Sequence, residues 1–507
     1  MTATHALQAL LEASQSVTEH RPWPRVIVTP ETWNTLLEGL ASGAWTLLGL
    51  WGEPVMVHLA VREGASGTLA IASLPCPTGQ FPSVGRCHPP AQRLERTLVD
   101  LTGLRPMDAV DARPWLDHGR WPVRHPLGSA TAPGESMPPY RFLPVEGESL
   151  HQIPVGPVHA GIIEPGHFRF TANGEAVVRL EERLGYVHKG IESLLNGADV
   201  GRAARLVGRV SGDSTVAYAW AFARAVEAAT ETEAPERAHW LRALMAELER
   251  LANHCGDFGA ICNDAAFAMM LAYCAVLRER VLRASATCFG HRLMMDRIVP
   301  GGVAHDLSAD GINALRALIA EFRHQFPALI ELYDKTASLQ NRTEHTGFVK
   351  PALIQQFGCG GYIGRAGGRA FDARRAIAYP PYDELLFDVP VLSESDVNAR
   401  VWIRIREVEQ SLRLIEQILE QLPVGPIGNA LRRPGNAREG VAVVEGFRGD
   451  VLVWVRLTAA GAVERCHPRD PSWFQWPLLE AAIEDNIVAD FPLCNKSFNC
   501  SYSGHDL

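Results

Sequence analysis

The stretch 234–255, APERAHWLRALMAELERLANHC, has the pattern that decides the fold of this chain. Its apolar residues recur every three to four positions, which is the period of an α-helix with one buried face. The same spacing is found in 215–229, 265–289, 309–340 and 396–422. These stretches predict a large domain that consists mainly of long helices.

A different period appears at 440–463, where Val441-Ala442-Val443-Val444 is followed, after a turn that contains glycine, by Val451-Leu452-Val453-Trp454-Val455. Runs of β-branched residues on both sides of a turn predict a β-hairpin. We expect this hairpin to be a strand-rich insertion in the helical domain, and to end in a loop with Arg465, His467, Pro468 and Arg469.

The first hundred residues predict a small α/β domain. Short apolar runs at 45–50 and 55–61 are separated by turns with glycine, as in a sheet. The stretch 93–103 predicts an amphipathic helix that Gly103 ends, with Leu94, Leu98 and Leu101 on one face and the charges on the other.

The composition changes between these parts. From Trp121 to about Glu148 the chain is rich in Pro, Gly, Ser and Ala, which is typical of a linker. We therefore predict three segments: an α/β domain at 1–122, a linker at 123–148 and a mainly helical domain at 149–507. The predicted fold class is α+β.

The bulk composition excludes several functions. Of 507 residues, 47% are hydrophobic and 21% are charged, as in ordinary globular proteins, and the net charge of −9 offers no basic field for nucleic acid. No run of about 18 apolar residues predicts a membrane span, and the N-terminus does not resemble a secretory signal. The ten cysteines include no C-x-x-C pair, so buried free thiols are expected.

A series of short motifs carries a resemblance to a known family. In order along the chain they include Gly156-Pro157-Val158-His159, Glu164-Pro165-Gly166-His167, Gly185 to Glu192, Pro300 to Val303, Asn341-Arg342-Thr343 and Glu445 to Asp450. This order resembles the large subunit of group 4 membrane-bound hydrogenases and its relative, the forty-nine-kilodalton subunit of respiratory complex I. The region before the linker resembles the thirty-kilodalton subunit of complex I, which group 4 hydrogenases fuse ahead of the large subunit.

The resemblance implies a nickel-iron site held by R-x-C-G-x-C and D-P-C-x-x-C, but this chain departs from both motifs. Laid on 209–214 and on the C-terminal segment, the four cysteine positions fall on Ser211, Ser214, Ser501 and Gly504. A serine hydroxyl is a hard, neutral oxygen at pH 7 and glycine has no side chain, so no thiolate cage for nickel and iron is expected. We predict that this chain binds no metal or other cofactor.

The quinone chemistry of the complex I relative is also in doubt. There, a histidine four residues after the first His of G-P-x-H, and a tyrosine in the segment that matches 209–214, help to form the headgroup site. The corresponding residues here are Ile163 and Gly212. Neither side chain can donate a proton, so a quinone would need a different binding mode.

Four residues remain candidates for chemistry at the vestigial site. Glu164 corresponds to the acidic residue that moves protons in the hydrogenase family, and with His159 and His167 it could relay protons or simply form a buried ion pair. Tyr218 could line a residual cavity or pack in the core of its helix. Arg209 is expected to pair with Asp213 or Glu164.

The resemblance implies a peripheral subunit of a membrane-bound respiratory oxidoreductase complex, at the cytoplasmic face of the inner membrane. Its partners would be an iron-sulfur small subunit with a 4Fe-4S cluster, and antiporter-like and quinone-chamber membrane subunits, through which all membrane contact would pass. One alternative is a non-catalytic scaffold that keeps the hydrogenase fold. The other is an active hydrogenase, which would require nickel.

Overall fold

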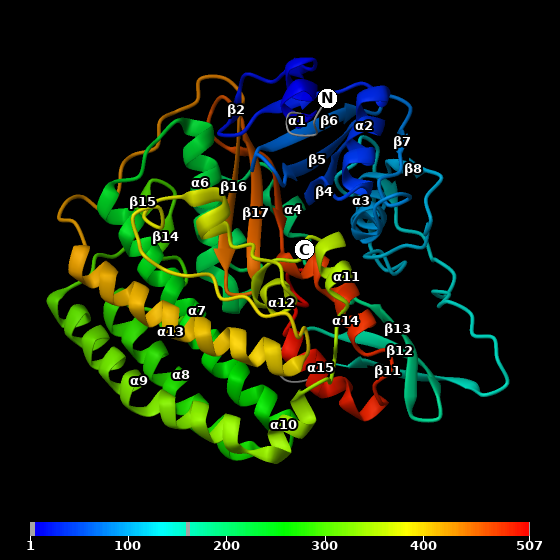
Figure 1. The fold of residues 1–507 in the computed structure, drawn as a ribbon. Helices are drawn as coiled ribbons and strands as arrows, with labels where there is room; N and C mark the ends of the chain where they lie inside the picture. The colour runs from blue at the N-terminus through cyan, green and yellow to red at the C-terminus, as the bar shows by residue number, and fades with distance from the viewer. Residues whose placement is uncertain (1–5, 159–162, 506–507) are drawn as a thin grey trace.

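The computed structural model describes residues 6–158 and 163–505. An N-terminal unit of strands and short helices lies against a body of long helices, and a twisted sheet runs between them (Figure 1). The α+β class predicted from the sequence is confirmed.

All of the predicted long helices are present. They are α6 (Thr215–Thr230), α7 (Glu236–Asp264), α8 (Ala268–Phe289), α9 (Ala309–Lys335) and α13 (Val397–Gln421). Helix α7 packs against α8 and α13, and Leu241, Leu244 and Leu248 on α7 are fully buried. The helix predicted at 309–340 is in fact two, because Thr336 adopts an extended backbone conformation between α9 and α10 (Ala337–Thr343).

The predicted hairpin is formed by β16 (Arg438–Gly446) and β17 (Gly449–Leu457), which pair in antiparallel register. The prediction of a loop at 465–469 was wrong, because β18 (Val463–Arg469) pairs with β17 along its length. Its residues after Glu464 are buried, charged side chains included, which hides the usual strand pattern. Strand β2 (His20–Arg21) pairs with β16 and completes a four-stranded sheet, on which α6 packs.

The N-terminal unit has a five-stranded sheet in the order β1-β3-β6-β5-β4. These strands are β1 (Gln15–Ser16), β3 (Arg25–Ile27), β4 (Trp45–Glu53), β5 (Met56–Glu63) and β6 (Leu69–Pro75), and the unit also includes α1 (Ala6–Glu12) and α2 (Pro30–Ala41). Helix α3 (Gln92–Thr102) ends at Gly103, whose φ of 79° is left-handed, as predicted.

The charged face of α3 is not exposed as expected. Glu95 and Asp100 are both buried. The Asp100 carboxylate accepts hydrogen bonds from the backbone N–H groups of Trp115, Leu116 and Asp117, at 2.7–3.2 Å. The segment after α3 therefore covers part of the charged face of this helix.

Buried ion pairs join the N-terminal unit to the body. Arg25 donates from one nitrogen to both carboxylate oxygens of Glu439 at 2.9 Å. Arg456 binds both oxygens of Glu53 at 2.6 and 2.7 Å. The predicted domain limits at 122 and 148 stay a prediction, since residues 1–122 are tied to the last third of the chain by these contacts.

Between these parts, residues 123–148 contain only the two-residue strands β9 (Val123–Arg124) and β10 (Ala132–Pro133). They lead into the antiparallel sheet of β11 (Leu150–Val158), β12 (Gly166–Asn173) and β13 (Ala176–Arg183). The shorter elements of the chain are β7 (Gln80–Pro82), β8 (Arg105–Met107), α4 (Ile191–Leu195), α5 (Val200–Val207), β14 (Ile298–Val299), β15 (Gly302–Val303), α11 (Pro351–Gln356), α12 (Gly361–Ala366), α14 (Trp476–Ala482) and α15 (Phe491–Phe498).

Candidate functional site

Three of the four residues that replace the family's ligand cysteines meet in the interior. Ser211 precedes a turn of 3-10 helix before α6, and Ser501 follows α15, almost three hundred residues later. Their Oγ atoms lie 3.1 Å apart, and both side chains are 3% exposed. Ser214 is also buried, and it is joined to Ser211 through Asp213, whose Oδ1 accepts hydrogen bonds from both hydroxyls, at 2.8 Å from Ser211 and 3.4 Å from Ser214. We call Ser211, Ser214 and Ser501 the serine cluster.

An ion pair closes one side of the serine cluster. Arg448, in the turn between β16 and β17, donates to both oxygens of Asp213 at 2.8 and 2.6 Å and to Ser214 Oγ at 3.2 Å. Its Nε also donates to the carbonyl oxygen of Asn499 at 2.5 Å. Burial alone would raise the pKa of Asp213, but Arg448 and the serine hydroxyls hold that pKa below its ordinary value.

The fourth residue that replaces a ligand cysteine, Gly504, lies against a carboxylate. A Cβ atom built on Gly504 would lie 2.3 Å from Asp470 Oδ2, which is closer than real Cβ contacts allow. The Tyr218 hydroxyl donates to the same oxygen at 2.5 Å, and Ser472 N donates to Asp470 Oδ1 at 2.8 Å. These hydrogen bonds fix Asp470 in place, so a side chain at position 504 would need the strand end at 470 to move.

The structure places Tyr218 in the core, with its hydroxyl bound to a carboxylate near the serine cluster. It lies on α6 with no exposed surface, as expected for a core residue. Its hydroxyl nevertheless reaches the edge of the serine cluster through Asp470. Burial and the neighbouring carboxylate raise the pKa of Tyr218 well above its ordinary value, so the hydroxyl stays protonated and acts as a donor.

Sequence reasoning missed a carboxyl group next to the cluster, Glu249 on α7. Its two oxygens accept from the backbone N–H groups of Val216 and Ala217, in the first turn of α6, at 2.7 and 3.2 Å. Burial raises the pKa of Glu249 to about 8, although these hydrogen bonds lower it, and the nearby Asp213 raises it further. A carboxyl group that titrates near neutral pH therefore lies beside the serine cluster.

This pKa predicts how stability depends on pH. A carboxyl group whose folded pKa lies above its unfolded value stabilises the fold at low pH, and that contribution is lost as pH rises through about 8. The unfolding free energy of wild type should decrease between pH 5 and pH 9. In Glu249→Gln this decrease should be smaller, by on the order of 1–3 kcal/mol. Urea unfolding at both pH values measures it. The exposed change Glu420→Gln on α13 is the control, and equal pH dependence in both variants would contradict the assignment.

The structure describes two of the three residues that were predicted to relay protons. His159 lies outside the described residues. Glu164 is half-buried. His167 is 6% exposed, its Nδ1 lies 3.0 Å from the carbonyl oxygen of Gly156, and its ring packs on Phe142 at 4.8 Å. Burial lowers the pKa of His167, so it is mainly neutral at pH 7 and its contacts hold the hairpin of β11 and β12.

Arg209 and Lys189 make contacts that the sequence did not predict. Arg209 does not pair with Asp213 or Glu164. It pairs with Asp296 at 2.7 Å on the surface, and Arg448 takes the place next to Asp213. Lys189 donates to the carbonyl oxygens of Val210 and Ser503, both at 2.8 Å, and so joins the two segments that carry the serine cluster.

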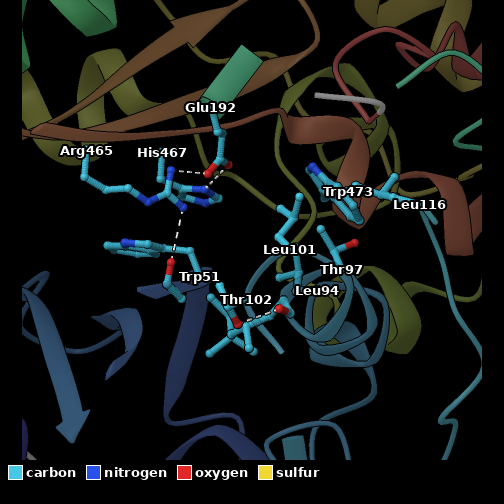
Figure 2. A pocket seen from close by; sticks show the side chains of 13 residues that line it. Trp51, Leu94, Thr97, Leu101, Thr102, Leu116, Glu192, Arg465, His467 and Trp473 are labelled. Atoms are coloured by element: carbon cyan, nitrogen blue, oxygen red, sulfur yellow. Dashed lines mark hydrogen bonds and ion pairs between the residues drawn. The ribbon is translucent and has the colours of Figure 1, made fainter. Parts of the chain in front are cut away.

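A separate internal cavity of about 30 Å³ lies where α3 meets β18 (Figure 2). On one side His467 Nδ1 lies 2.8 Å from Glu192, Arg465 pairs with the same carboxylate, and the His467 ring stacks on Trp51 at 5.0 Å. The other side is apolar, with Leu94, Leu101 and Trp473. Burial would raise the pKa of Glu192, but the two basic partners hold it at about 2. This space suits a water molecule and not a quinone ring.

The cysteines and the other possible ligands form no metal centre in the described ranges. No group of three or more His, Cys, Asp or Glu side chains there is placed to hold a metal ion. Nine of the ten cysteines are buried, and burial raises the pKa of Cys494 to about 12 and that of Cys500 well above its ordinary value. These thiols are therefore protonated at neutral pH.

Comparison with known proteins identifies the family. Residues 189–261 match the family described as nickel-dependent hydrogenase, and residues 264–435 match the respiratory-chain NADH dehydrogenase 49 Kd subunit. The carbon monoxide-induced hydrogenase of Rhodospirillum rubrum is 30% identical over 355 residues, which are 69% of this chain and 98% of that protein. The chain belongs to this hydrogenase and complex I family.

Other members of the family extend the match. Formate hydrogenlyase subunit 5 of Escherichia coli strain K12 is 29% identical over 437 residues, which cover 84% of this chain and 77% of that protein. Among solved structures, a chain of the membrane-bound sulfane sulfur reductase, an archaeal respiratory membrane complex, superposes with a TM-score of 0.67 at 26% identity. It covers 72% of this chain and 100% of that chain.

The solved relative is part of a membrane-bound respiratory complex, and the matches together fit a chain that is like the large subunit of group 4 hydrogenases. In the part of this chain that the structure describes, no helix is both long and apolar enough to cross a membrane.

Proposed function

We propose that this chain is a peripheral subunit of a membrane-bound respiratory oxidoreductase complex, and that it works without a nickel-iron centre. The observation that carries the proposal is the serine cluster, with its hydroxyl groups hydrogen-bonded to one another and to Asp213. Nothing in this arrangement supplies the thiolates that nickel and iron require in the hydrogenase relatives.

The residues present do not fit the nickel-iron group for two physical reasons. First, serine hydroxyls are hard neutral oxygens, and here their hydrogen bonds are already used within the protein. Second, the ion pair of Arg448 and Asp213 lies against the cluster and the Asp470 carboxylate lies against Gly504. Because Arg448 binds both oxygens of Asp213, this carboxylate is not free to bind a metal cation.

What the cluster can do is hold and pass protons. The hydroxyls of Ser211 and Ser501 each donate and accept, and Asp213 is an ionised acceptor beside them. Glu249 adds a carboxyl group with a pKa of about 8, suited to exchange a proton at neutral pH. In this proposal the site exchanges protons while electrons come from a neighbouring subunit.

The proposed partners follow from the family. They are an iron-sulfur small subunit with a 4Fe-4S cluster, and antiporter-like and quinone-chamber membrane subunits, with the chain at the cytoplasmic face of the membrane. The proposed electron acceptor is a quinone, bound differently from the complex I mode because Ile163 and Gly212 offer it no polar side chain. Ion translocation in the membrane subunits would be coupled to this step.

Gly212 offers a direct test of a substrate at the cluster. It is exposed, it follows Ser211, and a Cβ atom built there meets no atom within 4 Å, so Gly212→Trp should fold. The indole would cover the approach to the serine cluster. We expect quinone-dependent turnover of the purified complex to fall about tenfold or more, because the substrate can no longer take its position.

The size-matched control for this experiment is Ala437→Trp, in the exposed segment before β16. It should leave turnover unchanged. Equal turnover in Gly212→Trp, with normal assembly, would remove the substrate from this site and favour the scaffold function instead.

A further inference from the structure

A buried carboxylate and a half-buried one lie at an open cleft between the N-terminal unit and the body. The cleft has a volume of about 760 Å³, and its walls include α3, β13 and α14. Arg93 of α3, Glu182 of β13 and Glu480 of α14 meet there. We call these three residues the cleft triad.

The charges of the cleft triad do not balance. Arg93 donates to Glu182 Oε1 at 2.5 Å and to Glu480 Oε2 at 2.7 Å. The backbone N–H of Glu182 donates to the other oxygen of Glu480 at 2.8 Å. One guanidinium therefore serves two carboxylates, and Glu182 has no exposed surface. An uncompensated negative charge in such a place is strongly destabilising.

The groups around the triad do not pair with its second carboxylate. Arg179 of β13 also lines the cleft, but its guanidinium donates to the carbonyl oxygens of Leu143 and Pro144. From β13, Glu181 is paired with Arg113, and Arg96 of α3 is paired with Asp111. The C-terminal segment faces the triad with Cys500, Tyr502 and His505; burial keeps the first two protonated and lowers the pKa of His505, so all three are neutral. Just beyond α14 the cleft also contains Glu484, which is acidic.

One carboxylate oxygen is left without a partner. Among the described residues Glu182 Oε2 makes no hydrogen bond, although this atom is buried. A buried carboxylate oxygen without a hydrogen bond is costly, whereas a protonated carboxyl group carries no net charge and donates to a single water molecule.

We propose that Glu182 and Glu480 together bind one proton, which exchanges with solvent through the cleft, so that the chain has a proton-binding site in addition to the serine cluster. Burial raises the pKa of both groups, and Arg93 opposes the shift without cancelling it. With one proton bound, the cleft triad is neutral.

The position of this site suggests where its proton is used. The Tyr502 ring packs on Trp476 of α14 at 4.7 Å, and Trp476 donates to the carbonyl oxygen of Ser501 at 3.3 Å. The triad is thus one layer of side chains away from the serine cluster, and would supply protons from the cleft side. This use rests on the proposed function, but the binding of the proton does not.

Infrared spectroscopy of the chain with ¹³C-labelled glutamate tests the proposal. Glu480→Gln retains a carbonyl oxygen for the N–H of Glu182, and Glu182→Gln retains one for Arg93, so both variants should fold. Each should lose one protonated-carboxyl C=O band that wild type shows at pH 7. The control Glu175→Gln, at the exposed turn before β13, should keep the band.

Solvent exchange of the band that the two variants identify gives a second measurement, made on wild type. The same band should shift as soon as the protein is diluted into D₂O, because the triad opens to the cleft. An unchanged band in both variants, or a band that exchanges only on unfolding, would overturn the proposal. Turnover is not measured in this experiment, so its failure would not touch the function proposed for the serine cluster.

Discussion

Replacement of Arg365 by methionine is expected to destabilise the protein by at least about 3 kcal/mol, enough to prevent assembly at ordinary temperature. Arg365 is fully buried on α12 and donates to Glu407 at 2.8 Å, to Glu445 at 2.9 Å and to the carbonyl oxygen of Phe371 at 3.0 Å. Its Nη1 also lies 3.4 Å from Asp372. Removal of the guanidinium would leave these carboxylates together in the core with too little compensating charge.

The network around Arg365 explains why the loss would be large. The buried groups are Arg250, Arg365 and Arg374 against Glu247, Asp372, Glu407 and Glu445, so the carboxylates already outnumber the guanidinium groups. Burial and the nearby Asp372 raise the pKa of Glu445 to about 7, although Arg365 lowers it, which fits one carboxyl group that keeps its proton. Without Arg365 more protons would have to bind for the chain to fold.

Chemical unfolding at pH 7 measures this effect. The control is Arg323→Met on α9, whose pair with Glu416 lies on the surface, with the arginine side chain 53% exposed. That change should alter the unfolding free energy by less than about 1 kcal/mol. If Arg365→Met were as stable as the control, the network would not be the part of the core that we take it to be.

Replacement of Arg448 by methionine is the second large effect that we expect, of about 2–3 kcal/mol in stability, together with loss of turnover. Arg448 is 4% exposed and joins Asp213, Ser214 and the backbone of Asn499, and so connects the start of α6 to the C-terminal segment. Without it, the charge of Asp213 lies beside Glu249 with no cation, and the serine cluster loses its fixed geometry.

A double variant separates charge from packing at this site. In Arg448→Met with Asp213→Asn no unpaired carboxylate remains, so we expect about half of the lost stability to return while turnover stays low. Arg209→Met, which removes only the surface pair with Asp296, should match wild type. A double variant that is less stable than Arg448→Met would show that Asp213 is not destabilised by the loss of its partner.

The sequence predicted the elements better than the contacts between them. The helices of the body followed from the spacing of leucine and alanine, since that period depends on local burial alone. The spacing could not show the break at Thr336, where one extended residue divides a continuous apolar pattern into two helices. It also could not show the strand β18, because the buried charges of this strand are paired with residues elsewhere in the chain.

The same limit applies to the site. The replaced cysteine motifs led to Ser211 and Ser501, and the structure brings these side chains together. Glu249 and Asp470 were missed because their importance comes from contacts with the start of α6, which lies more than thirty and more than two hundred residues away. Nothing local in the sequence distinguishes Glu249 from the other acidic residues of its helix.

Metal analysis of the complex, purified through a tag on this chain, tests the central claim most directly. The claim is that a chain of the hydrogenase and complex I family works here with a hydroxyl cluster and no nickel-iron centre. We expect iron from a neighbouring cluster and nickel far below one atom per chain. Nickel at one atom per chain, together with hydrogen uptake, would contradict the account.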